Sequence, residues 1–248
     1  MTVNSEHLIV DRDFLLNLEP APQTKTYGGV DHHKVYDLAK EIAVGAGLNF
    51  IKDRIEVTKQ GKRAYMQLHF ENFLPGFSEF TYTVGIRSTY DKSASLAFAS
   101  GPAVFICSNQ QIHGEDVTVH RKHSKYIMND IGDLMEQVVA SGKERYESRI
   151  NHLNAMRSTD LTTKQGQLII GCARGLGLLG SKTTKSAMDH WMQPPFEEFR
   201  GENNMFGLHN ALTWAAHTER PSRKLEFHKS MNEFMDTVKV VDEKLVIG

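Results

Sequence analysis

The clearest indication of the fold is FIKDRIEVTKQGKRAYMQLHF, residues 50–70, which contains two strand-like segments on either side of a turn. The segments FIKDRIEV and AYMQLHF alternate apolar with polar side chains and are rich in β-branched and aromatic residues. The connection TKQGKR has the glycine and polar residues typical of a tight turn. Short connections favour antiparallel pairing, so the stretch predicts a β-hairpin.

Similar segments extend this pattern along the chain. EFTYTVGIR (residues 79–87) and ASLAFASGPAVFIC (residues 94–107) predict two more strands, joined by a turn at TYDKS, and HKVYDLAKEIAVGAG (residues 33–47) predicts a helix before the sheet. From Tyr126 onward the apolar period becomes helical, with further helices expected near residues 161–176, 183–191, 205–218 and 222–238. The sequence therefore predicts an α+β protein, with an N-terminal helix and antiparallel β-meander followed by a helical C-terminal half.

The same pattern suggests how the chain is organised. Residues 1–30 are expected to form a leader, residues 31–125 the helix and antiparallel sheet, and residues 126–248 a helical region packed on the sheet as one unit.

Composition limits the function classes. The 248 residues are 40% hydrophobic and 24% charged, as in an ordinary globular protein, and no apolar stretch reaches the ~20 residues that span a bilayer. Two cysteines give no disulfide framework, so a cytoplasmic location is expected. Because the net charge is -1, nucleic-acid binding would require a local basic patch.

GLGLLGSKTT, residues 175–184, has the spacing G-x-G-x-x-G of a dinucleotide-binding loop. Such a loop must follow a strand and begin a helix, but the preceding KQGQLIIGCAR has helical spacing. Gly175 and Gly177 are therefore expected at the end of a helix. The interpretation is a helix–loop–helix joint, and no cofactor is expected.

The segment from Arg87 to Asn109 resembles the phage- and plasmid-like protein family, a domain-of-unknown-function family numbered nine hundred and thirty-two. Positions matching the family motif are Arg87, Ser88, Tyr90, Asp91 and Ser93, followed by Phe105, Cys107 and Asn109. Tyr90 stands where that family has histidine, and Lys92 where it has glycine. The resemblance implies a viral or mobile-element origin and a cytoplasmic protein, without a defined chemistry. A coarser similarity, in fold alone, is to the single-strand-annealing recombinases of phages.

Basic clusters are the strongest functional signal in the residues themselves. KQGKR lies at the tip of the predicted hairpin, and HRKHSK precedes the long helix. Together with tyrosines on the strands, they predict a groove that contacts phosphates and stacks bases of single-stranded DNA in recombination or annealing. The predicted interface consists of Lys59, Lys62, Arg63, Tyr65, Arg87, Tyr90, Lys92, Arg121, Lys122, His123 and Lys125. A homo-oligomer is the assembly that this interpretation suggests.

Two other functions remain open at this stage. One is an enzyme or ligand-binding protein with a polar pocket formed by Arg87, Asp91, Asn109, Asn210 and His217. The other is an inhibitor that binds a host protein, for which a near-neutral surface is sufficient. Asn210 and His217 share a helix face with Thr213 and are expected to form a buried polar network or to line that pocket. No catalytic residue and no metal site is assigned, because the histidine spacing fits no standard ligand set.

Overall fold

The computed structural model describes residues 7–20, 22–25, 28–75, 80–104, 119–121, 127–194, 200–201, 203–241 and 244–247. Its main sheet has six antiparallel strands whose spatial order equals their order in the chain, so the predicted meander is confirmed. The strands are β1 (His7–Val10), β2 (Phe50–Thr58), β3 (Arg63–Phe70), β4 (Phe80–Thr89), β5 (Leu96–Val104) and β6 (Val119–Arg121).

Residues 1–30, expected to be a leader, contain β1 and the short 3-10 helix η1 (Asp13–Asn17). The remaining elements are α1 (His32–Gly45), α2 (Ile127–Arg157), α3 (Thr163–Gly175), α4 (Ser181–Met192), α5 (Met205–Trp214), η3 (Ala215–Thr218), α6 (Pro221–Thr237) and the hairpin β7 (Val238–Val241) and β8 (Lys244–Ile247). This arrangement confirms the α+β class with a helical C-terminal half. The final hairpin was not expected from the sequence.

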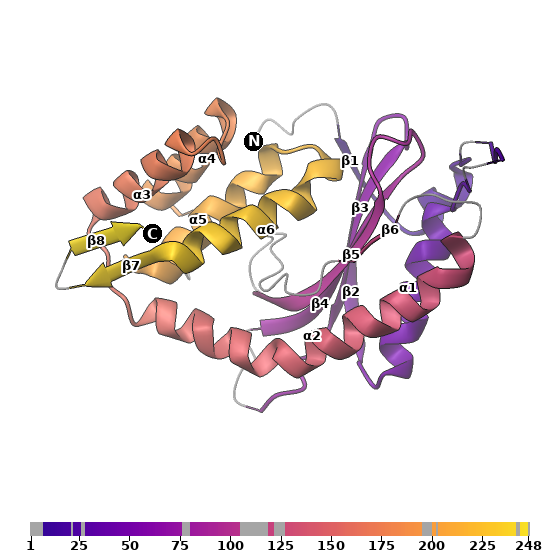
Figure 1. The fold of residues 1–248 in the computed structure, drawn as a ribbon, viewed down its shortest axis with the longest axis horizontal. Helices are drawn as coiled ribbons and strands as arrows, with labels where there is room; N and C mark the ends of the chain where they lie inside the picture. Colours follow the sequence, from indigo (N-terminus) through magenta and orange to yellow (C-terminus); the bar gives the residue numbers. More distant parts are fainter. Residues whose placement is uncertain are drawn as a thin grey trace.

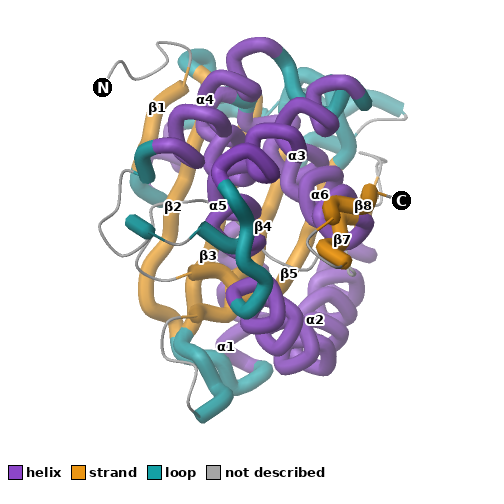
Figure 2. The backbone as a smooth tube through the Cα atoms, turned by 90° about the vertical axis from the view of Figure 1, so that its left-hand side faces the viewer, coloured by secondary structure: helices purple, strands orange, loops and turns teal. Residues whose placement is uncertain are grey.

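Helices cover both faces of the main sheet, with α1 and α2 on one side and α6 on the other (Figure 1). Seen from the side of the C-terminal helices, α3 to α6 lie in front of the strands (Figure 2). The face toward α1 and α2 is mainly apolar, with Met66, Ile86 and Phe98 completely buried. The Ser100 hydroxyl donates to the carbonyl oxygen of Val138 at 2.7 Å, which fixes α2 against β5.

The segment GLGLLGSKTT forms the joint between α3 and α4. Gly177 has a φ of 77°, the left-handed conformation that glycine adopts at low cost after a helix. Its N–H donates to the carbonyl oxygen of Arg174 at 3.1 Å, and the N–H of Leu178 donates to that of Ala173 at 3.0 Å. These two bonds form a Schellman motif. Gly180 then precedes α4, so the expected helix–loop–helix joint is confirmed and no strand leads into the glycines.

Among the described residues, no helix combines the length and the apolar character that crossing a bilayer requires.

Candidate functional site

Strand register brings the predicted basic segments to one end of the main sheet. Arg63 of β3 pairs with Thr89 of β4, and Arg121 of β6 pairs with Leu96 of β5. The β2–β3 turn, the β4–β5 turn and Arg121 of β6 therefore lie at the same end of the strands. With strands ~4.8 Å apart, β3 and β6 are separated by about 14 Å there. We call this end of the sheet the basic end, and it is formed by Lys59, Lys62, Arg63, Lys92 and Arg121.

The two turns of the basic end are held together by direct contacts. The N–H of Tyr90 donates to the carbonyl oxygen of Lys62 at 2.7 Å, and Nε of Arg63 donates to Oδ2 of Asp91 at 2.6 Å. Burial alone would raise the pKa of Asp91, but hydrogen bonds from Ser93 and Arg63 outweigh it and lower the pKa. The Arg63 charge is therefore paired within the protein. Lys59, Lys62 and Lys92 are exposed.

His32, the first residue of α1, contacts the β2–β3 turn, the end of β4 and Tyr90 of the β4–β5 turn. One ring nitrogen, Nε2, lies 3.1 Å from the carbonyl oxygen of Gly61, and the other, Nδ1, lies 2.8 Å from Oγ of Ser88. Its ring stacks on that of Tyr90 with centroids 3.7 Å apart. His32 could not be predicted from the sequence, because a histidine at a helix start carries no signal of contacts 29 and 56 residues away.

The structure corrects three residues of the predicted interface. Tyr65, Tyr90 and Arg87 are only 1%, 5% and 4% exposed, so they cannot contact a nucleic acid on the surface of this structure. Tyr90 is covered by His32, and its hydroxyl accepts the N–H of that residue at 2.6 Å. Tyr65 packs with Ala97 and Leu225 beneath α6. The prediction that these rings stack on bases is therefore wrong.

Arg87 belongs to a buried polar layer between the main sheet and α6. Its guanidinium forms an ion pair with Glu226 of α6 and donates to the carbonyl oxygen of Ser95 at 3.1 Å. Nearby, Nζ of Lys224 lies 2.5 Å from Oε2 of Glu56, and both side chains are almost completely buried. Two ion pairs thus fix α6 on the polar face of the sheet.

The predicted polar pocket does not gather at one place. Asp91 is paired with Arg63 at the turn, whereas Arg87 is paired with Glu226 beneath α6. Asn210 is 1% exposed within α5, and the neighbouring Thr213 hydroxyl donates to the carbonyl oxygen of His209 at 2.8 Å. This burial fits a polar network rather than an open pocket.

His217, the other described member of the predicted pocket, also lies apart from Asp91. Its Nδ1 is 2.8 Å from the carbonyl oxygen of Trp214, and burial lowers its pKa to about 4.

Several predicted residues lie outside the described ranges: Lys122, His123, Lys125, Cys107 and Asn109. Of Arg121, the backbone pairing is described. Within the described ranges, no cluster of three histidine, cysteine or acidic side chains is arranged to hold a metal ion.

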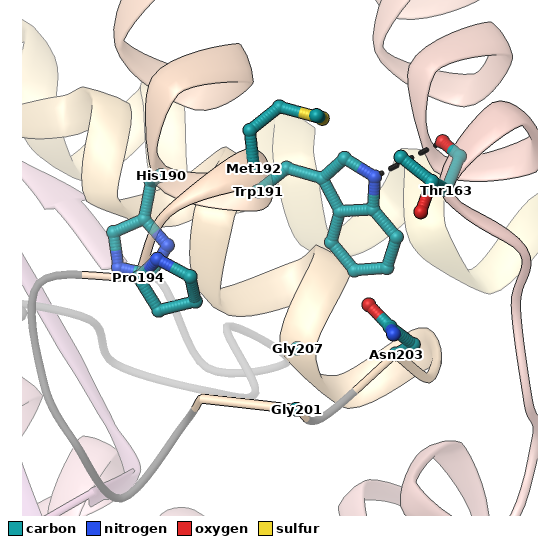
Figure 3. Close-up of a pocket in the computed structure, with 8 residues that line it drawn as sticks. All are labelled: Thr163, His190, Trp191, Met192, Pro194, Gly201, Asn203 and Gly207. Carbon is teal, nitrogen blue, oxygen red and sulfur yellow. Dashed lines mark hydrogen bonds between the residues drawn. The ribbon is translucent and has the colours of Figure 1, made fainter.

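A cavity of about 250 Å³ lies elsewhere, among α3, α4 and the start of α5 (Figure 3). Its most buried polar side chain is His190, which is 4% exposed. This cavity could not be predicted from the sequence, because its walls come from separate helices and no local pattern marks side chains that meet only after folding.

Comparisons of the chain with protein-family models, with curated proteins and with solved structures give no match.

Proposed function

We propose that this protein is a phage- or plasmid-derived accessory protein of the cytoplasm that binds single-stranded DNA at its basic end. The observation that supports the proposal is the strand register, which places Lys59, Lys62, Lys92 and Arg121 at the same end of the main sheet. Lysine and arginine side chains bind nucleic acids by neutralising phosphates and releasing their counterions.

The size and rigidity of the basic end fit this role. A span of about 14 Å is long enough to contact more than one phosphate of a single strand. Because His32 contacts Gly61 of the β2–β3 turn and Tyr90 of the β4–β5 turn, the two turns are held in a fixed arrangement before DNA arrives. Since Tyr65 and Tyr90 are buried, binding at this end depends on phosphate contacts and is expected to be independent of base sequence.

The test is the salt dependence of binding, measured by fluorescence anisotropy with a labelled single-stranded oligonucleotide. The variant Lys62→Ala/Lys92→Ala removes two exposed cations from the basic end. If each contacts one phosphate, the log–log slope should become shallower by about 1.4 units, at ~0.7 per phosphate.

The matched control is Lys182→Ala/Lys185→Ala, which removes two exposed lysines from α4, a helix that packs on α3, α5 and η3. This variant should keep the slope of the unsubstituted protein. An equal change in both variants, or no binding of the unsubstituted protein at low ionic strength, would refute the proposed interface. Equally tight binding of a duplex would contradict its preference for single strands.

A further inference from the structure

The cavity beside His190 combines a flat aromatic wall with hydrogen-bonding groups. It is lined by Thr163, His190, Trp191, Met192, Pro194, Gly201, Asn203 and Gly207. Figure 3 shows the Trp191 indole and the His190 ring above the backbone of Gly201 and Gly207, with the Asn203 amide below the indole. Asn203, Gly201 and Met192 are exposed, so the cavity opens to solvent on their side.

Trp191 forms a rigid wall. Its indole Nε1 donates to the carbonyl oxygen of Thr163 at 3.1 Å. On its other side the ring lies so close to Gly166 that a β-carbon there would come within 2.2 Å of it. The indole is therefore fixed in place without a ligand, and its orientation costs no entropy on binding.

His190 supplies unused hydrogen-bonding capacity. His190 is only 4% exposed, yet neither of its ring nitrogens has a hydrogen-bond partner in the described part of the structure. Burial lowers its pKa to about 4, so the ring is neutral at pH 7 and offers one N–H donor and one nitrogen acceptor. A buried polar group without a partner costs about 1–3 kcal/mol, which a ligand with matching groups would recover.

The lining limits the chemistry of that ligand. Among the described residues, none of the eight lining side chains carries a charge at neutral pH, so these side chains would not compensate the desolvation of an anion or a cation. An apolar ligand would leave the His190 nitrogens unsatisfied. A flat, neutral molecule with neighbouring donors and acceptors satisfies both conditions, and it can stack on an aromatic ring as bases do.

We propose that this cavity binds a nucleobase, which stacks against Trp191 and exchanges hydrogen bonds with His190 and Asn203. The base could come from a free nucleoside or from a nucleotide within a strand, because the recognised chemistry is the same. This site is separate from the basic end and does not rest on the function proposed for it.

The test is isothermal titration calorimetry of the full chain with adenosine, cytidine and uridine. At least one nucleoside should bind, and His190→Phe, which keeps an aromatic ring but removes both nitrogens, should weaken its binding at least tenfold. Asn203→Ala changes an exposed side chain and should also weaken binding, which keeps the test valid if the His190 variant does not fold. The matched control is Asn17→Ala, an exposed asparagine on η1, which should leave the dissociation constant unchanged.

Two outcomes would overturn the proposal: no heat of binding with any of the three nucleosides at millimolar concentration, or binding that both cavity variants leave unchanged. Competition by a short oligonucleotide identifies a base within a strand as the ligand, and its absence identifies a free nucleoside. The variant Lys62→Ala/Lys92→Ala should bind the nucleoside normally, so failure at the basic end and failure at the cavity are distinguishable.

Discussion

Mild acid should unfold this protein, because at least four of its histidines are buried as neutral rings. His69, His190, His209 and His228 are between 0% and 8% exposed. Burial lowers the pKa of the first three to about 4 and that of His228 to about 3, from an ordinary value of 6.5. The unfolded chain therefore binds more protons than the folded protein between pH 6.5 and about 4, so the free energy of unfolding falls as the pH is lowered through this window.

The size of the effect follows from these pKa values. At pH 5, a histidine with a pKa of 6.5 in the unfolded chain and about 4 in the folded protein reduces stability by about 2 kcal/mol. Four such residues reduce it by on the order of 8 kcal/mol, which is comparable to the whole stability of a typical domain, about 5–15 kcal/mol. We therefore expect loss of the folded state near pH 5.

The assay is urea denaturation followed by circular dichroism at several pH values from 7.5 to 5. The variant His228→Leu provides the decisive comparison. The ring nitrogens of His228 have no hydrogen-bond partner in the described structure, so leucine removes no hydrogen bond found there. Leucine should increase stability at pH 7, because it removes an unsatisfied buried group costing about 1–3 kcal/mol. It should also reduce the pH slope by about 1.4 kcal/mol per pH unit, the contribution of one proton.

A free energy of unfolding that stays constant from pH 7 to pH 5 would refute this reasoning, since it would mean that the rings are not buried as neutral groups. If the free energy of unfolding of His228→Leu depends on pH as steeply as that of the unsubstituted protein, then the pKa of His228 is the same in the folded and unfolded states.

Three further predictions concern stability and can be measured by the same denaturation. Gly177→Ala should destabilise the protein by about 1–2 kcal/mol because its φ is 77°, whereas Gly171→Ala, inside α3 with open space around the new methyl group, should stabilise it by ~1 kcal/mol. Lys224→Met should cost about 3–5 kcal/mol because it leaves the Glu56 carboxylate buried without its lysine, and adding Glu56→Leu should restore part of the loss. Gly142→Ala should cost about 1–3 kcal/mol, since the new methyl group would lie 2.0 Å from the Ser100 hydroxyl and would push α2 away from β5.

Local signals predicted most of the fold correctly. The meander followed from alternation and short turns, which act between residues close in sequence. The end of α3 followed from Gly175 and Gly177 after an apolar helical stripe, and the Schellman motif there has only local partners. By contrast, β1 was missed because HLIV is only four residues long and acquires its pairing from β2, more than forty residues later.

Burial of the second sheet face could not be predicted in the same way. Gln67, His69 and Thr83 alternate with apolar neighbours along β3 and β4, which is the usual pattern of strands with one face in water. The structure covers that face with α6, which follows about 140 residues later in the chain. Arg87 was assigned to a phosphate-binding surface for this reason, although its partner is Glu226.

The helical half was expected to pack on the sheet, but no local pattern indicates which face of the sheet α6 covers. The sequence PSRKLEFHKS contains charges of both signs, as a solvent-exposed helix does, yet Lys224 is 1% exposed and paired with Glu56, 168 residues earlier. A buried ion pair adds little net stability compared with a well-packed apolar pair, but it strongly disfavours any packing that separates the two charges. The buried pair of Lys224 with Glu56 therefore selects one position of α6 on the sheet, and Arg87 pairs with the half-exposed Glu226 in that position. Such a selection depends on complementary charges in two distant segments, and it becomes visible only when both are placed in the same structure.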